Sequence, residues 1–84
     1  MGVLDDRTKE ALLALGAHLR TARDKLGVSQ VQLAKRIKMD PANLLKVERG
    51  QKNVTLDTLL RIADGLGMEL VVRLRPAKKP RPTG

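Results

Sequence analysis

The sequence of 84 residues contains no cysteine and no phenylalanine, tyrosine or tryptophan. Without cysteine there is no disulfide framework and no thiolate metal site. Without aromatic residues the core must consist of Leu, Ile, Val, Met and Ala side chains, which suit short, closely packed helices. His18 is the one histidine. Because it has no second histidine or cysteine with which to share a metal, we interpret it as a surface or boundary residue.

The chain also lacks a long apolar run. No segment is long enough to cross a membrane, and no signal-peptide core is visible. There is no Gly-rich phosphate loop and no pairing of a nucleophile with a base, since the serines and acids are accounted for by helix caps and surface positions. We therefore expect a soluble, cytoplasmic protein that is not an enzyme and that needs no metal or other cofactor.

Acidic residues are scarce relative to basic ones. The chain has 17 Lys and Arg against 9 Asp and Glu, which gives a net charge of +8 and a pI near 10.7. Residues 1–72 carry 12 basic and 9 acidic side chains, whereas residues 73–84 carry 5 basic side chains and no acid. The sequence thus combines a mildly basic body with a basic arm, and both indicate a polyanionic partner.

A chain of this length forms one domain at most. A domain this small buries only about 60% of the surface of its unfolded chain, so its stability is marginal without help. Dimerisation is the obvious source of that help, because no disulfide or metal is available.

Apolar residues recur every three or four positions in the first third of the chain, which predicts a helix over residues 5–26. Gly27 is a natural end for it. Gly16 lies inside the pattern and costs a helix about 1 kcal/mol relative to alanine. It therefore allows an alternative, in which a bend separates two helices over residues 5–14 and 16–26.

A helix-turn-helix pattern fills residues 29–50. Ser29 is a strong N-cap, and Gln32 completes a capping box, so a short helix should cover about residues 30–37. The apolar residues of this helix that should face inward are Leu33, Ala34 and Ile37.

A second short helix, over about residues 41–49, should follow a turn at residues 38–40. Asp40 is a suitable N-cap, and Pro41 stands at the first helical position, where its missing N–H costs nothing. Gly50 ends this helix. Its apolar residues point inward, and polar and small residues occupy its outer face.

A fourth helix should begin after the cap Thr55 and end at Gly65 to Gly67. The predicted apolar face of this helix consists of Leu56, Leu59, Leu60, Ala63 and Leu66.

The pattern then changes to the alternation of a β-strand over residues 68–75. One strand in a helical chain has no partner, and an unpaired edge is a liability. Pairing with the same strand of a second subunit across a two-fold axis resolves this; packing on its own domain is the alternative. The residues expected at the dimer contact are Met68, Leu70, Val72 and Leu74.

The predicted organisation is therefore a helix-turn-helix domain over residues 1–67, a dimerisation strand over 68–76 and a basic, Pro-rich tail over 77–84. We expect the tail to be disordered. It is either a solvated arm or a segment that reaches DNA phosphates or the minor groove.

The motifs over roughly residues 15–67 resemble the XRE family of phage-repressor and Cro-like helix-turn-helix proteins. The resemblance implies an all-α domain of four to five helices that binds double-stranded DNA. The sequence departs from the family where Lys38 replaces the usual glycine of the turn, and where Pro41-Ala42 replaces Gln or Ser. The residues that carry the resemblance are Gly27-Val28-Ser29-Gln30, Leu33-Ala34, Ile37, Leu44, Val47-Glu48, Gly50, and Thr55-Leu56, Leu59-Leu60, Ile62-Ala63 and Leu66-Gly67.

In this family the start of the second helix of the motif enters the major groove. The positions implied to contact bases are Pro41, Ala42, Asn43 and Lys46. An asparagine amide pairs with adenine, and a lysine donates to guanine, whereas proline can only pack. The alternative is that Asn43 and Lys46 are ordinary exposed helical residues.

The resemblance also implies phosphate contacts, which fix register without reading sequence. The positions implied are Gln30, Lys35, Arg49, Lys52 and Asn53. A further implied feature is an ion pair between Arg23 and Glu48 that would hold the second helix of the motif against the first helix of the chain.

A strand and basic tail after such a domain resemble the HipB-type antitoxins of toxin–antitoxin operons. This second resemblance implies a homodimeric autorepressor of a palindromic operator that also binds a cognate toxin. Controllers of restriction–modification systems and small phage repressors share this kind of domain and differ in the operon that they regulate. The alternative class is a protein-interaction module that uses the same surface, strand or tail to bind another protein.

Overall fold

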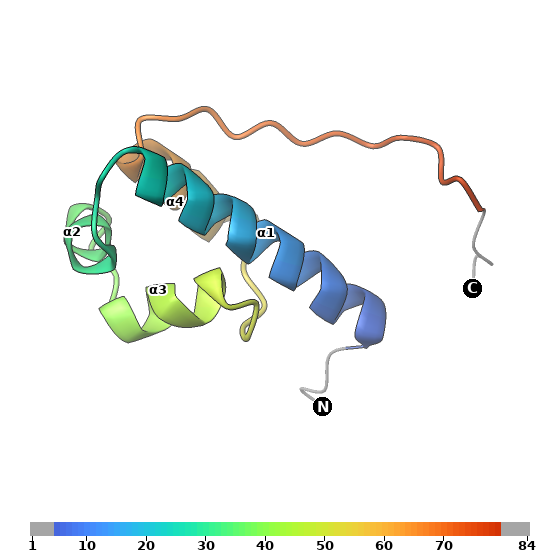
Figure 1. Ribbon diagram of the computed structural model, residues 1–84, viewed down its shortest axis with the longest axis horizontal. Helices are drawn as coiled ribbons and strands as arrows, with labels where there is room; N and C mark the ends of the chain where they lie inside the picture. The colour runs from blue at the N-terminus through green and yellow to red at the C-terminus, as the bar shows by residue number, and fades with distance from the viewer. Residues whose placement is uncertain (1–4, 80–84) are drawn as a thin grey trace.

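The computed structural model describes residues 5–79, and these fold into an all-α domain in which four helices surround one core (Figure 1). The fold confirms the expected helical class. The helices are α1 (Asp6–Lys25), α2 (Gln30–Arg36), α3 (Pro41–Glu48) and α4 (Leu56–Gly65).

Each helix begins with a side-chain cap. Ser29 and Gln32 form the predicted capping box: Ser29 Oγ accepts from the Gln32 backbone N–H at 3.1 Å, and Gln32 Oε1 accepts from the Ser29 N–H at 2.8 Å. Asp40 and Thr55 cap α3 and α4 as expected. Asp5 caps α1. The hydrogen bond that its carboxylate accepts from the Thr8 backbone N–H lowers the pKa of this carboxyl below its usual value. Such caps stabilise a helix by about 1 kcal/mol each.

Helix α1 is continuous, so the alternative of two helices with a bend at Gly16 is wrong. Gly16 is buried where α1 meets the end of α3. A Cβ atom at this position would lie 2.6 Å from the carbonyl oxygen of Val47 and closer still to that of Glu48. The glycine is therefore required by the approach of a second backbone, which local helix propensity does not reveal.

The core lies between α2, α3, α4 and the C-terminal half of α1. Leu33, Leu44 and Ile62 are its fully buried large side chains. The inward face predicted for α4 is partly wrong, because Leu56 and Leu60 are 59% and 46% exposed. The remaining buried members of the core are Val28, Ala34, Ile37, Val47 and Leu66.

Beyond α4 the chain is extended. Within residues 5–79 the structure contains no β-strand, because residues 69–79 form no backbone hydrogen bond with another described residue. Figure 1 shows the segment leaving the end of α4 as a chain without secondary structure. A strand requires a neighbour, so pairing with a second subunit stays a prediction. Residues 80–84 of the predicted tail lie outside the described residues.

None of the helices in the described part of the chain is both long and apolar enough to span a bilayer.

Candidate nucleic-acid interface

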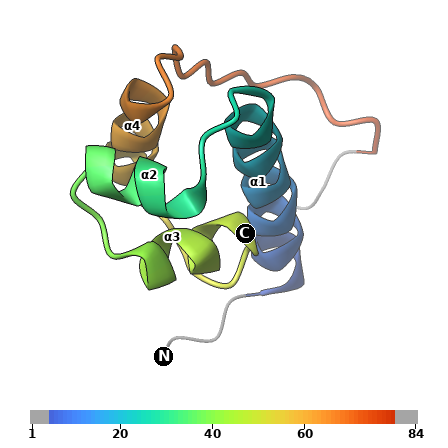
Figure 2. The ribbon, with the colours of Figure 1, turned by 60° about the vertical axis from the view of Figure 1, so that its left-hand side comes forward.

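The turn between α2 and α3 leads into α3, which lies at the edge of the helical domain (Figure 2). Lys38, at the position where a glycine was expected, has a φ of 55°, so this lysine adopts the left-handed conformation. The backbone N–H of Met39 then returns to the carbonyl of Ala34 at 2.9 Å, which closes the turn. Left-handed backbone costs a lysine about 1–2 kcal/mol, so the surrounding contacts must hold this turn in place.

The exposed side of α3 is formed by Ala42, Lys46 and Arg49, whose spacing of four and three residues places them on one helical stripe. Pro41 is also exposed at the start of the helix, and Asn43 is half-buried at the edge of the stripe. All four predicted base-contacting positions thus lie at the exposed beginning and outer side of one short helix.

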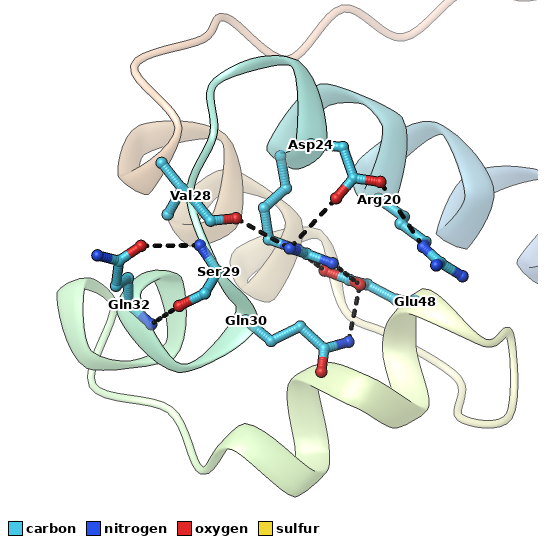
Figure 3. A network of polar contacts seen from close by, with 8 residues as sticks. Arg20, Asp24, Val28, Ser29, Gln30, Gln32 and Glu48 are labelled. Atoms are coloured by element: carbon cyan, nitrogen blue, oxygen red, sulfur yellow. Dashed lines mark hydrogen bonds and ion pairs between the residues drawn. The ribbon is translucent and has the colours of Figure 1, made fainter.

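An ion pair fixes α3 against α1 (Figure 3). Arg23 donates from Nε to Glu48 Oε2 at 2.8 Å and from Nη2 to Glu48 Oε1 at 3.0 Å, so the pair is bidentate. The side chains are only 9% and 2% exposed. The structure therefore brings together the two residues whose pairing the family resemblance implied.

The remaining polar atoms of this pair are also satisfied. Arg23 Nη1 donates to the carbonyl of Val28 at 2.9 Å, which ties the start of α2 to the same side chain. The hydrogen bonds that Arg23 donates to Glu48 raise the pKa of Arg23 above its ordinary value, so the guanidinium stays charged. No buried side-chain nitrogen or oxygen in the described residues lacks a partner. A buried ion pair that is fully hydrogen-bonded in this way resists separation of the helices it joins.

Gln30 lies beside the ion pair, as Figure 3 shows. Its Nε2 donates to Glu48 Oε1 at 2.9 Å. An amide nitrogen carries two hydrogens, so this bond uses only one of them. The side chain is therefore held in position by Glu48 before any ligand arrives.

Two hollows flank α3 and collect most of the predicted phosphate-contacting residues. The first lies between α1, α2 and α3, and it contains Gln30 and Arg49 together with Arg20. The second lies between the turn, α3 and the start of α4, and it contains Lys52 and Asn53. Lys35 is exposed on α2 and lines neither hollow.

Sequence reasoning missed three basic residues at these hollows, Arg20, Lys38 and Arg61. Arg20 lines the first hollow, one helical turn before Arg23. Its side chain is 69% exposed and lies 3.8 Å from Asp24. Lys38 lines the second hollow. In the sequence, only the spacing of three residues between Arg20 and Arg23 could have indicated that Arg20 lies at the first hollow. Lys38 was noted only because it replaces the usual glycine of the turn.

Two arginines connect α2 and α4 in opposite directions. Arg61 of α4 donates from Nη2 to the carbonyl oxygens of Ile37 and Lys38 at the end of α2. Arg36 of α2 donates from Nη1 to the carbonyl of Gly65 at the end of α4, at 3.2 Å. The last carbonyls of a helix have no partner within it, so each arginine satisfies the exposed end of the other helix.

The described residues contain no group of three or more His, Asp and Glu side chains arranged to hold a metal ion. Lys46, Arg49 and Lys52 are exposed on and beside α3, so the surface around this helix carries several cations. This arrangement fits a long, regularly spaced polyanion.

Comparison with known proteins defines the class as a helix-turn-helix transcriptional regulator. Residues 14–75 match the family model described as a helix-turn-helix domain, and the chain belongs to this family. A curated relative, an uncharacterized HTH-type transcriptional regulator of Haemophilus influenzae, is 37% identical over 70 residues, which cover 82% of this chain and 71% of the relative.

Solved structures of gene regulators share the fold. The restriction-modification controller protein C.AhdI from Aeromonas hydrophila superposes with a TM-score of 0.70 at 38% identity, over 71% of this chain and 91% of the controller. The clp gene regulator ClgR from Corynebacterium glutamicum does so with a TM-score of 0.68 at 36% identity, over 69% and 74% of the two chains. The resemblance to XRE-type proteins is thereby confirmed.

Proposed function

We propose that this protein is a sequence-specific autorepressor that binds a palindromic operator as a homodimer, with α3 in the major groove. The observation that carries the proposal is the exposed stripe of α3, which the buried Arg23–Glu48 pair fixes against α1. A rigid helix with a small and polar outer side, flanked by cations, has the form of a DNA reader.

Base readout rests on few side chains. Lys46 donates to the acceptors of guanine, and the Asn43 amide pairs with adenine. Ala42 contacts a thymine methyl group, and Pro41 packs against the groove. Because direct readout by one copy is limited, sequence-dependent DNA shape also contributes to specificity.

Phosphates on either side of the groove are held by the residues of the two hollows. Gln30 uses its second amide hydrogen, and Arg49 lies in the same hollow. Lys52 and Asn53 hold the phosphates on the other side of α3, and Lys35 adds a contact from α2. These contacts supply affinity that depends strongly on salt and little on sequence.

Two copies are needed for tight binding. Recognition helices about 34 Å apart read successive major grooves on one face of B-DNA. We assign the contact between copies to the extended segment after α4, whose apolar residues Met68, Leu70, Val72 and Leu74 are expected to pair with a second chain. The basic residues that follow add charge near the DNA.

The operon type is a finer proposal. An extended apolar segment followed by basic residues favours an antitoxin that also binds a toxin encoded beside it. The likeness to a restriction-modification controller favours that role instead. The neighbouring gene distinguishes them, since a toxin supports the first and a restriction endonuclease or methyltransferase the second.

Titration of the protein onto its own promoter fragment and onto a scrambled fragment of the same composition, at several salt concentrations, tests the proposal. A specific repressor prefers the promoter by about 4 kcal/mol or more. Equal affinity for both fragments would reject sequence-specific regulation and leave a basic protein that binds DNA without specificity.

A further inference from the structure

The segment from Met68 to Arg75 exposes an unusual amount of apolar surface. Val71 and Val72 are 61% and 73% exposed, and Leu74 is fully exposed. Met68 is 49% exposed. Consecutive exposed apolar side chains on an extended backbone without hydrogen-bond partners indicate a surface that another chain covers.

Symmetry restricts how two copies of this segment can pair. In an antiparallel pair related by a two-fold axis, directly opposite side chains lie on the same face of the ribbon. The axis must therefore pass midway between one residue and its own copy, and every other residue pairs with the one equally far on the other side. Choosing the central residue fixes the entire register.

A register centred on Val71 gives every side chain from Met68 to Leu74 a complementary partner. It places Glu69 of each copy opposite Arg73 of the other, which gives two ion pairs on the face that also carries the central valines. On the other face each apolar residue meets an apolar residue: Leu70 faces Val72, and Met68 faces Leu74.

The neighbouring registers are worse. Centring on Val72 places Met68 opposite Pro76, which cannot donate to a ladder. Centring on Leu70 places Leu74 opposite Leu66, which is buried in the core at the end of α4 and cannot join a strand. Centring on Arg73 stacks two like charges directly across the axis.

We infer that two copies pair through an antiparallel ribbon with the two-fold axis midway between the two copies of Val71 and with reciprocal Glu69–Arg73 ion pairs. The inference rests on the homodimer of the proposed function, whose contact it specifies residue by residue. Glu69 is the one acid beyond α4, and its position four residues before Arg73 is what makes the ribbon complementary to itself.

Because the chain has no cysteine, single cysteines report the register directly. Val71→Cys should form a disulfide-linked dimer under mild oxidation in the full-length protein, since directly opposite residues lie within disulfide reach. Leu70→Cys and Val72→Cys should link far more slowly, because their copies lie diagonally, about 7–8 Å apart. Faster linking at position 70 or 72 would overturn the register.

Exchange of the charges at positions 69 and 73 provides a test that does not depend on disulfide formation. Glu69→Arg and Arg73→Glu each place like charges opposite one another in a homodimer, so each should raise the dimer Kd by about tenfold. Mixing the two variants restores opposite charges at both positions, so the mixed dimer should form preferentially. As a matched control, Glu69→Arg mixed with Arg75→Glu should gain nothing.

The outcomes separate this inference from the proposed function. A dimer that still binds the promoter but shows neither the Val71 crosslink nor the charge rescue would overturn the ribbon and leave the repressor intact. Loss of promoter preference in the native protein would instead reject the repressor. A protein that is monomeric in sedimentation at micromolar concentration and does not crosslink would overturn the ribbon as well.

Discussion

Glu48 is the residue on which the position of α3 depends most. It accepts two of the three hydrogen bonds that Arg23 donates and one more from Gln30, with its own side chain 2% exposed. Glu48→Ala would remove the buried partner of Arg23 and leave it only the exposed Asp24 carboxylate at 3.4 Å, which costs up to about 3–5 kcal/mol. We expect a large fall in the midpoint of urea unfolding.

The double variant Arg23→Met with Glu48→Leu is the control for that experiment. It removes both charges and keeps apolar volume, so most of the lost stability should return. If Glu48→Ala unfolds at the same urea concentration as the native protein, the pair does not hold the fold together.

Gly16→Ala is expected to change the stability of the protein in the direction opposite to that given by helix propensity. Replacing glycine by alanine within a helix ordinarily stabilises it by about 1 kcal/mol. Here the new methyl group would meet the backbone carbonyls of Val47 and Glu48, so Gly16→Ala should destabilise the protein by about 1–3 kcal/mol. Ala17→Gly, at the next and exposed position, measures the propensity term alone. A Gly16→Ala variant that melts higher than the native protein would contradict the close approach.

At the scale of elements, the reciprocal arginines link α2 to α4, but only one of them contacts the turn before α3. Arg61→Met removes the bonds to Ile37 and Lys38, so it should lower stability by about 1 kcal/mol and also weaken promoter binding. Arg36→Met breaks the matching bond to Gly65, away from the turn. It should cost similar stability with little loss of binding. Equal losses of binding would show that Arg61 does not position α3.

The sequence predicted elements well where the signals are local. The capping box at Ser29, the caps at Asp40 and Thr55 and the turn at Lys38 all depend on neighbouring residues, and the structure shows each of them. The Arg23–Glu48 contact spans 25 residues, and only the family resemblance suggested it.

The sequence-based predictions failed where contacts with an element distant in the sequence determine the structure. Gly16 was interpreted through propensity, although α3 dictates it. On α4, leucines occupy both the buried and the exposed sides, so hydrophobicity alone did not separate Leu60 from the buried Ile62. The segment after α4 forms no strand within the described residues of one chain, and its pairing with a second copy stays a prediction.

At the scale of the whole molecule, we assign the contact between copies to the segment after α4 and the reading of DNA to the helical domain. Deleting residues 68–84 removes the proposed dimer contact and a large part of the net positive charge. We expect sedimentation to show a monomer at concentrations where the native protein is a dimer. Promoter affinity should fall with it, because each half-site alone is read by few side chains. An unchanged dimer after deletion would place the contact elsewhere.

The central claim is that the exposed stripe of α3 reads sequence while the surrounding cations hold phosphates. The most direct measurement is the ratio of affinities for promoter and scrambled DNA in the native protein, Lys46→Ala and Lys52→Ala. Lys46→Ala should lower the free-energy preference for the promoter by about 1–3 kcal/mol. Lys52→Ala should weaken both affinities alike and reduce the salt dependence. A ratio that falls with Lys52→Ala and not with Lys46→Ala would contradict the account.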